Sequence, residues 1–97
     1  MAFEIILAPE AIRDLEKLSA NLRGEVRDAI ERHLRYRPTK TSKARIKRLR
    51  GVSRPQFRLR VRDTRVFYDV VGTEVQILAV VSKEQAEEWL REARSAK

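Results

Sequence analysis

The chain has 97 residues and a formal net charge of +8, with 22 lysines and arginines against 14 acidic residues. This length fits one domain, residues 1–97, and the absence of cysteine excludes disulfides and thiolate chemistry. No stretch approaches the ~18 apolar residues needed to cross a bilayer, and the N-terminal residues lack the pattern of a signal peptide. We therefore expect a soluble, cytoplasmic protein.

The N-terminal part of the chain predicts one strand and two helices. Residues 3–8, FEIILA, are short and rich in isoleucine, as in a buried strand. Pro9 suits the first position of a helix, and Glu10 follows where the helix dipole favours an acid. The apolar stripe of this helix is formed by Ala11, Leu15 and Leu18. Asn21 is expected to cap a second helix that ends before Pro38 and carries Leu22, Val26, Ile30 and Leu34 at helical spacing.

The C-terminal part predicts a series of strands. Residues 44–51, ARIKRLRG, fit either a short strand or an irregular lead-in. Residues 56–63, QFRLRVRD, alternate apolar and basic side chains, which indicates a half-buried strand. Two further strands, RVFYDVV and VQILAVV, follow across short turns and complete a meander.

A capping box opens the last helix, because Ser82 is followed by Gln85 three positions later. The element order is therefore β-α-α-β-β-β(-β)-α. We expect an α+β fold in which the two N-terminal helices pack on one face of an antiparallel sheet.

The positive charge is concentrated in one segment, residues 43–65, which contains a single acid, Asp63. Its net charge is +9, so the rest of the chain sums to −1. The ten basic residues are Lys43, Arg45, Lys47, Arg48, Arg50, Arg54, Arg58, Arg60, Arg62 and Arg65. A segregated positive field of this kind attracts phosphate backbones or acidic proteins.

Within this segment, Phe57, Leu59 and Val61 alternate with Arg58, Arg60 and Arg62. If the apolar set packs beneath the helices, the three arginines lie together on the opposite, open face. Like charges repel at this spacing, so their clustering favours a bound polyanion, which arginine engages well through its planar fork. The alternative is a solvated face whose arginines pair with nearby glutamates.

Four stretches of the chain, taken in order, resemble a known family: FEIILAPEAIRDLEKL, IKRLRG, FRLRVRDTRVFYDV and VQILAVVSKEQAEEWL. The chain resembles, almost from end to end, the RelE/ParE superfamily of toxins from bacterial and archaeal type II toxin–antitoxin modules. The resemblance implies a small toxin fold whose concave basic face meets RNA.

The resemblance also implies a reaction and partners. RelE-like members cut messenger RNA in the ribosomal A site by attack of the 2′-hydroxyl, giving a 2′,3′-cyclic phosphate, and they use no metal or cofactor. ParE-like members inhibit DNA gyrase instead. Both are neutralised by an acidic or amphipathic helical antitoxin, and the pair commonly binds operator DNA. A RelE-like toxin, a ParE-like inhibitor and a catalytically degenerate regulatory protein all stay open at this point, and none involves a membrane.

The resemblance assigns catalytic positions to Arg58, Arg60, Arg65 and Lys83. RNA contacts are expected from the remaining basic residues of the same region: Lys43, Arg45, Lys47, Arg48, Arg50 and Arg62. The tyrosine that RelE-like nucleases carry in the final helix is replaced here by Trp89, which cannot exchange a proton at its ring nitrogen. This departure leaves the general acid and base of a ribonuclease unassigned.

Arginine stays protonated in proteins, so the arginines can stabilise phosphorane charge but cannot act as bases. Lys83 can transfer protons if its pKa is lowered among the arginines. Glu84, Glu87 and Asp63 are further candidates for proton transfer. His33, the only histidine, is expected on the surface of the second helix, away from the site.

Three aromatic residues have competing interpretations. Tyr68 shares a strand face with Val66 and Val70, which favours a buried tyrosine with a satisfied hydroxyl. Phe67 shares the face of Arg65 and is a candidate for stacking on a base. Trp89 is expected to pack the last helix onto the sheet, with a place in an antitoxin-binding groove as the alternative.

Overall fold

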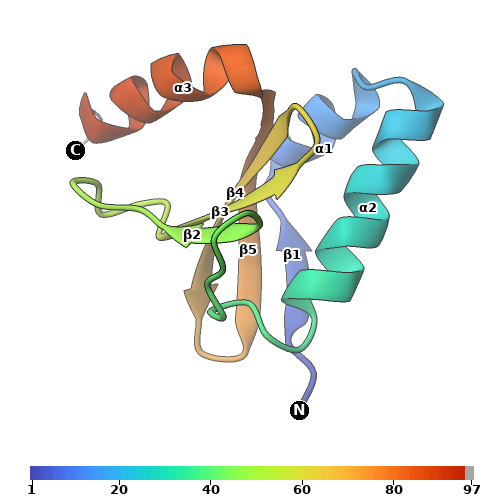
Figure 1. Cartoon of the computed structure of the whole chain (residues 1–97), viewed down its shortest axis with the longest axis vertical. Coiled ribbons are helices and arrows are strands. Elements are labelled where there is room, and N and C mark those ends of the chain that lie inside the picture. Colours follow the sequence, from blue (N-terminus) through green and yellow to red (C-terminus); the bar gives the residue numbers. More distant parts are fainter. Residues whose placement is uncertain (96–97) are drawn as a thin grey trace.

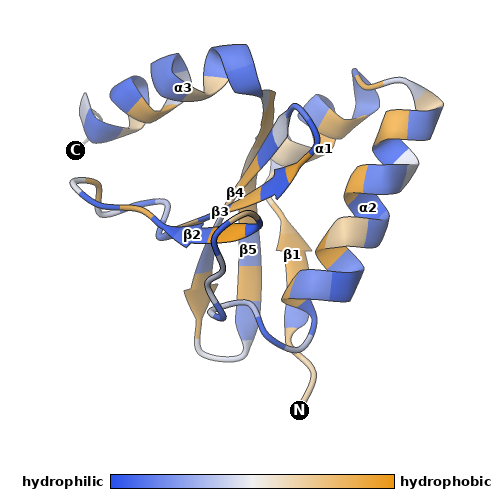
Figure 2. Cartoon of the chain, in the orientation of Figure 1, coloured by the Kyte–Doolittle hydropathy of each residue, from blue (hydrophilic) through white to orange (hydrophobic). Residues whose placement is uncertain are grey.

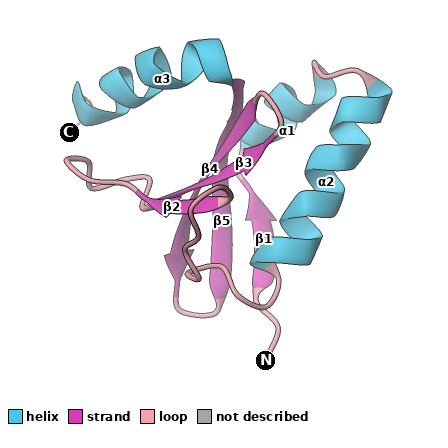
Figure 3. Ribbon diagram, in the orientation of Figure 1, coloured by secondary structure: helices cyan, strands magenta, loops and turns pink. Residues whose placement is uncertain are grey.

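The computed structural model describes residues 1–95, which form a five-stranded sheet and three helices (Figures 1 and 3). The elements are β1 (Glu4–Leu7), α1 (Pro9–Glu16), α2 (Ala20–Leu34), β2 (Ile46–Arg48), β3 (Phe57–Val61), β4 (Thr64–Val71), β5 (Glu74–Ser82) and α3 (Lys83–Ser95). This order confirms the predicted one, with β2 as the optional short strand. None of the helices in this part of the chain is long and apolar enough to cross a membrane.

The strands follow the order β1-β5-β4-β3-β2 across the sheet. β2, β3, β4 and β5 pair antiparallel, as predicted, but β1 pairs parallel with β5. The sheet is therefore mixed, and the expectation of a wholly antiparallel sheet is wrong in this respect. Periodicity in the sequence identifies β1 as a strand but does not specify its partner, which lies some seventy residues away in the register Glu4↔Glu74.

The core lies between the sheet and the α1–α2 pair. On β3 and β4 the alternate residues Phe57, Leu59, Val66 and Tyr68 are all at most 3% exposed. They meet buried residues of the helices, namely Ala11, Leu15, Val26, Ile30 and Leu34. The period of two in QFRLRVRD thus assigns its apolar side chains to the face that α1 and α2 cover.

α1 also completes the hydrogen bonding of β5. β1 ends at Leu7, which pairs with Ile77, so the edge of β5 beyond that point has no strand beside it. There the Asp14 carboxylate accepts a hydrogen bond from the Val80 amide at 2.9 Å. This contact satisfies a backbone donor that the short β1 leaves open.

The caps of the later helices differ in how well the sequence predicted them. Ser82 accepts a hydrogen bond from the Gln85 amide at 3.3 Å, which confirms it as the cap of α3. The cap of α2 is Ser19, whose hydroxyl accepts from the Leu22 amide, and not Asn21. Ser19 has the extended backbone (φ −61°, ψ 157°) that a cap requires, and Asn21 already lies within the first turn.

α3 packs on the opposite face of the sheet from α1 and α2 (Figure 1). The indole of Trp89 stacks on the ring of Phe67 with centroids 4.8 Å apart and an interplanar angle of 7°. The indole nitrogen donates to the Glu10 carboxylate at 3.1 Å. The helix is mostly hydrophilic (Figure 2) and has no fully buried residue, and this aromatic contact attaches it to the sheet.

Tyr68 is wholly buried, as predicted. Its ring stacks on Phe57 at 5.5 Å, and its hydroxyl donates to the carbonyl oxygen of Pro38 at 2.7 Å. Burial raises the pKa of the Tyr68 hydroxyl, so this group stays protonated at physiological pH. The bond ties the chain that leaves α2 to the centre of the sheet.

We expect Tyr68→Phe to lower the free energy of unfolding by about 1 kcal/mol, because it leaves the Pro38 carbonyl without its buried donor. Tyr36→Phe is the matched control, since Tyr36 is 64% exposed, and it should change stability by less than about 0.5 kcal/mol. Urea unfolding followed by circular dichroism measures both. Equal stabilities of the two variants would contradict the role given to the Tyr68 hydroxyl.

Candidate functional site

A basic groove of about 560 Å³ lies between α3 and the β2–β3 side of the sheet. It is lined by Lys47, Arg48, Leu49, Arg50, Arg58, Arg65, Phe67, Lys83, Ala86, Glu87, Leu90 and Arg94. Seven of these residues are lysine or arginine, and Glu87 is the only acid among them. We call this feature the groove.

Strand register brings the basic side chains of the groove together. Lys47 on β2 pairs with Arg58 on β3, which pairs with Phe67 on β4. In the next row, Arg60 pairs with Arg65 across the hairpin. Paired residues share a face of the sheet, so these cations lie on the face opposite the core. Cations that are adjacent in this way repel one another, which costs the free protein some stability.

Arg65 is held rigidly at the edge of the groove. Its side chain is 8% exposed, and its Nη1 donates to the carbonyl oxygens of Arg62 at 2.9 Å and Thr64 at 3.1 Å. No carboxylate of the described residues forms a salt bridge with it. A buried guanidinium fixed by backbone carbonyls keeps its positive charge available to an anion in the groove.

Arg58 is the least satisfied polar group of the described structure. Its Nε is buried without a hydrogen-bond partner, and it too lacks a salt bridge among these residues. Burial, followed by repulsion from Arg65 and Arg60, lowers the pKa of the Arg58 guanidinium. The charged form is therefore held in surroundings less favourable than water, and an anion in the groove would stabilise it by offsetting the repulsion.

The segment between β2 and β3 forms another wall of the groove and is anchored at its far end. The buried Asp69 carboxylate accepts from the Arg54 side chain at 2.6 Å and from the Gln56 amide at 2.7 Å. The Gln56 side chain in turn accepts from the Val70 amide at 2.8 Å. These bonds attach the end of the loop to β4, and Arg54 is thereby neutralised outside the groove.

α3 contributes two groups that can transfer protons. Lys83 and Glu87 are four residues apart on the helix and both line the groove. The Lys83 amide donates to the Asp63 carbonyl at 2.7 Å, which fixes the start of the helix beside the β3–β4 turn. The other acids considered from the sequence, Glu84 and Asp63, do not line the groove.

Several predicted site residues lie elsewhere. Arg62 does not share the face of Arg58 and Arg60, because β3 ends at Val61 and Arg62 adopts a positive φ of 54° in the turn. Its guanidinium pairs with Glu25 on α2. The prediction that three arginines share one face is therefore wrong for Arg62. That face is also not open, because α3 covers part of it.

The other predicted contacts divide between the groove and its surroundings. Lys47, Arg48 and Arg50 line the groove, together with Arg58, Arg65 and Lys83. Arg60 is exposed beside Arg65 but does not line the groove. Lys43 is exposed on the connection before β2, and Arg45 lines a different hollow together with His33. His33 thus lies away from the groove, as predicted.

The aromatic residues of this face serve packing. Trp89 does not line the groove, and its stacking on Phe67 confirms the predicted structural role. Although Phe67 is one of the lining residues of the groove, it is 0% exposed, so it offers no free surface to a base, and that interpretation is wrong. Trp89 therefore offers the groove no group for proton transfer.

Two lining residues, Leu49 and Arg94, were not predicted, and two more, Ala86 and Leu90, were expected beside Trp89 in packing or in an antitoxin groove. Ala86, Leu90 and Arg94 lie at helical spacing with Lys83 and Glu87, so one face of α3 supplies all five of its lining side chains. That spacing is visible in the sequence. The stacking of Trp89 on Phe67 decides which face of the helix meets the sheet.

Comparison with known proteins gives one family match. The model of the family described as "ParE toxin of type II toxin-antitoxin system, parDE" matches residues 5–87. No curated protein sequence matches the chain significantly.

Solved structures share the fold. A RelB–RelE antitoxin–toxin complex from Methanococcus jannaschii contains a chain 19% identical to this one, with a TM-score of 0.67, covering 87% of this chain and 96% of that chain. The RelBE2 toxin–antitoxin complex of Mycobacterium tuberculosis gives 25% identity and a TM-score of 0.64, covering 84% and 99%. An archaeal RelE–RelB complex from Pyrococcus horikoshii gives 24% identity and a TM-score of 0.64, covering 86% and 97%.

We expect Arg58→Met to raise the free energy of unfolding by about 1 kcal/mol, because it removes an unpartnered buried Nε and the repulsion from Arg60 and Arg65. The gain should shrink as salt screens the repulsion. Arg13→Met, an exposed change on α1 that alters net charge equally, serves as the control and should have little effect. Urea unfolding at low and high salt measures both, and a loss of stability in Arg58→Met would contradict the strain assigned to Arg58.

Proposed function

Because the chain belongs to the ParE toxin family of type II toxin–antitoxin systems, we propose that it is a toxin that inhibits translation by cutting messenger RNA in the groove. Membership in the wider RelE/ParE superfamily, expected from the sequence, is confirmed by the family match and by the RelB–RelE structures. The observation that carries the proposed reaction is the pair Arg58 and Arg65, half-buried and buried cations without carboxylate partners among the described residues.

The arginines suit the charge that develops during RNA cleavage. The 2′-oxygen forms a bond to the adjacent phosphorus while the bond to the 5′-oxygen breaks, which gives a 2′,3′-cyclic phosphate and a 5′-hydroxyl. The phosphorane between these states carries more negative charge on its oxygens than the substrate does. Arg58 and Arg65 are already positioned and desolvated, so they stabilise that charge without reorganising. Arg60 strengthens the same field from the adjacent position.

Proton transfer falls to α3 in this proposal. The Glu87 carboxylate takes the proton of the attacking 2′-hydroxyl, and the Lys83 ammonium gives a proton to the leaving 5′-oxygen. Both residues line the groove with the arginines, whereas Trp89 does not. Lys47, Arg48, Arg50 and Arg94 then bind the phosphates on either side of the scissile bond.

The partners follow from the same proposal. The similar solved chains are toxins in complexes with RelB-type antitoxins, and we propose that a cognate antitoxin, acidic or amphipathic and helical, neutralises this chain. Ribosomes and their mRNA are the proposed target in the cytoplasm. Operator DNA is bound through the antitoxin complex.

Arg58→Met tests the charge-stabilising role. It should fold at least as stably as the unaltered protein yet fail to arrest a cell-free translation reaction, because the phosphorane loses a preorganised cation. We expect cleavage of ribosome-bound mRNA, read by primer extension, to fall by about 10²-fold or more. Arg13→Met should remain fully active. Full activity in Arg58→Met would exclude the groove as the catalytic site.

Glu87→Gln and Lys83→Met test the proton-transfer roles. Each should lower the rate of cleavage by about 10²-fold to 10⁴-fold and remove one limb of the pH–rate profile. The acidic limb should disappear in Glu87→Gln and the basic limb in Lys83→Met. Glu84→Gln is the matched control, because Glu84 lies on the same helix but outside the groove. An unchanged pH profile in both variants would remove them from the mechanism.

A ParE-like inhibitor of DNA gyrase is the second candidate, and the description of the matching family favours it. That function needs no hydrolytic chemistry in the groove. Assays of DNA supercoiling by gyrase, run beside cell-free translation, separate the two. Inhibited supercoiling with normal translation would establish the second candidate in place of the first.

A further inference from the structure

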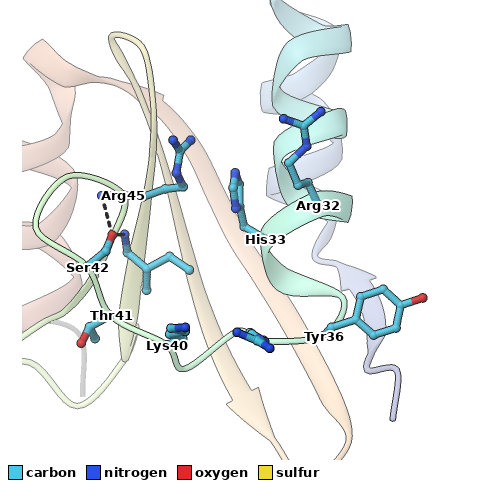
Figure 4. Close-up of a pocket in the computed structure, with 9 residues that line it drawn as sticks. Arg32, His33, Tyr36, Lys40, Thr41, Ser42 and Arg45 are labelled. Carbon is cyan, nitrogen blue, oxygen red and sulfur yellow. Dashed lines mark hydrogen bonds between the residues drawn. The ribbon is translucent and has the colours of Figure 1, made fainter.

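A second basic hollow of about 430 Å³ lies on the core side of the sheet, between α2, the connection that follows it and β2 (Figure 4). Its cationic side chains are Arg32, Arg37, Lys40 and Arg45, and His33 also lines it. It shares no lining residue with the groove. Adjacent residues of β2 separate the two features, because Ile46 lines this hollow and Lys47 lines the groove.

The charge in this hollow is not balanced locally. No acidic residue lines it, and none of its four cations belongs to a salt bridge of the described residues. On α2, the carboxylates of Glu31 and Glu25 are engaged by Arg35 and Arg62, which lie outside the hollow. The third acid of α2, Asp28, does not line the hollow and forms no salt bridge among the described residues. Four cations facing one space without an acid make a site that attracts anions.

The pKa of the His33 imidazole is sensitive to the positive potential inside the hollow. Its side chain is half-buried on α2 and faces Arg45 across the space between α2 and β2, with Arg32 one residue away along the chain (Figure 4). Burial, followed by repulsion from Arg45 and Arg32, lowers the pKa of the His33 imidazole. An anion that settles there would offset the repulsion from Arg45 and Arg32 and attract the imidazolium, which raises that pKa.

The floor of the hollow also presents hydroxyl donors. The Ser42 hydroxyl oxygen accepts from the Arg45 amide at 3.0 Å and the Ile46 amide at 3.4 Å. Because these bonds use its oxygen as acceptor, the hydroxyl proton is free to donate to a ligand. Thr41 beside it adds a second hydroxyl. The same bonds hold the connection against β2, so the donors are positioned in advance.

We propose that this hollow binds the backbone phosphates of a nucleic acid at a site separate from the groove. Arginine forks combined with hydroxyl donors are the groups that contact phosphate oxygens in nucleic-acid complexes. An acidic peptide would need apolar anchors inside the hollow. Ile46 there is 4% exposed, and the exposed ring of Tyr36 points away from His33 and Arg45 (Figure 4). With the groove on the other face of the sheet, the protein can contact two segments of backbone at once.

The single histidine makes the site directly observable. In the 97-residue chain with histidine labelled with ¹³C at Cε1, the imidazole gives one NMR signal, which is titrated with pH in the absence and presence of a short RNA hairpin. We expect the hairpin to shift this signal and to raise the His33 pKa. The same measurement on Arg58→Met, in which the groove is impaired, should give the same response, so the result does not depend on the function proposed for the groove.

Substitution provides the second measurement. The double variant Arg32→Gln/Arg45→Gln should weaken hairpin binding about tenfold at about 0.1 M salt. The negative slope of log affinity against log salt should become shallower by about 1 to 2. Arg13→Gln with Lys17→Gln removes the same charge from α1, outside both features, and should leave affinity within about twofold. Circular dichroism checks the folding of each variant.

The outcomes separate the possible ligands. A DNA hairpin of matching sequence shows whether the hollow accepts RNA, DNA or both, and any of these responses at His33 supports the proposal. If the His33 signal changes with neither hairpin, the proposal is wrong. It is also wrong if the double variant of Arg32 and Arg45 binds the hairpin as tightly as the α1 control. A His33 response to polyglutamate but to neither hairpin also overturns it, in favour of an acidic protein partner.

Discussion

The pleat of the β3–β4 hairpin is the constraint on which the other features depend. Successive side chains on these strands point to opposite faces, so a core that takes Phe57, Leu59, Val66 and Tyr68 leaves Arg58, Arg60, Arg65 and Phe67 on the other face. Burial of the apolar set against α1 and α2 fixes the register, because a slip by one residue would exchange the two sets. Hydrophobic contacts on the core face of the sheet therefore fix the position of the cations on the opposite face.

The second face is completed by α3 rather than left to solvent. On β4, Phe67 pairs with Arg58 of β3 on the face of the cations, and Trp89 stacks on its ring. This contact determines which side of α3 faces the sheet. It thereby places Lys83, Glu87, Leu90 and Arg94 along the groove. The stacking of Trp89 on Phe67 therefore determines which side chains of α3 line the groove.

Both basic features carry unbalanced charge in the free protein. Arg58 in the groove and His33 in the second hollow each have a pKa lowered first by burial and then by neighbouring cations. Some arginines outside these features are neutralised, as in the pairs of Arg54 with Asp69 and Arg62 with Glu25. Repulsion within the two features lowers the stability of the free fold, and both features are proposed to bind polyanions.

The sequence by itself determined the order of the elements, the apolar and basic faces of β3, the burial of Tyr68 and the cap of α3. Each of these follows from spacing or side-chain chemistry within a few residues. Only the tertiary structure decided that β1 lies parallel to β5, that Arg62 turns to Glu25, that Arg45 joins His33 instead of the groove, and that Arg94 enters it. These outcomes depend on contacts between residues far apart in the chain and on one positive φ in a tight turn, and neither leaves a periodic signal in the sequence.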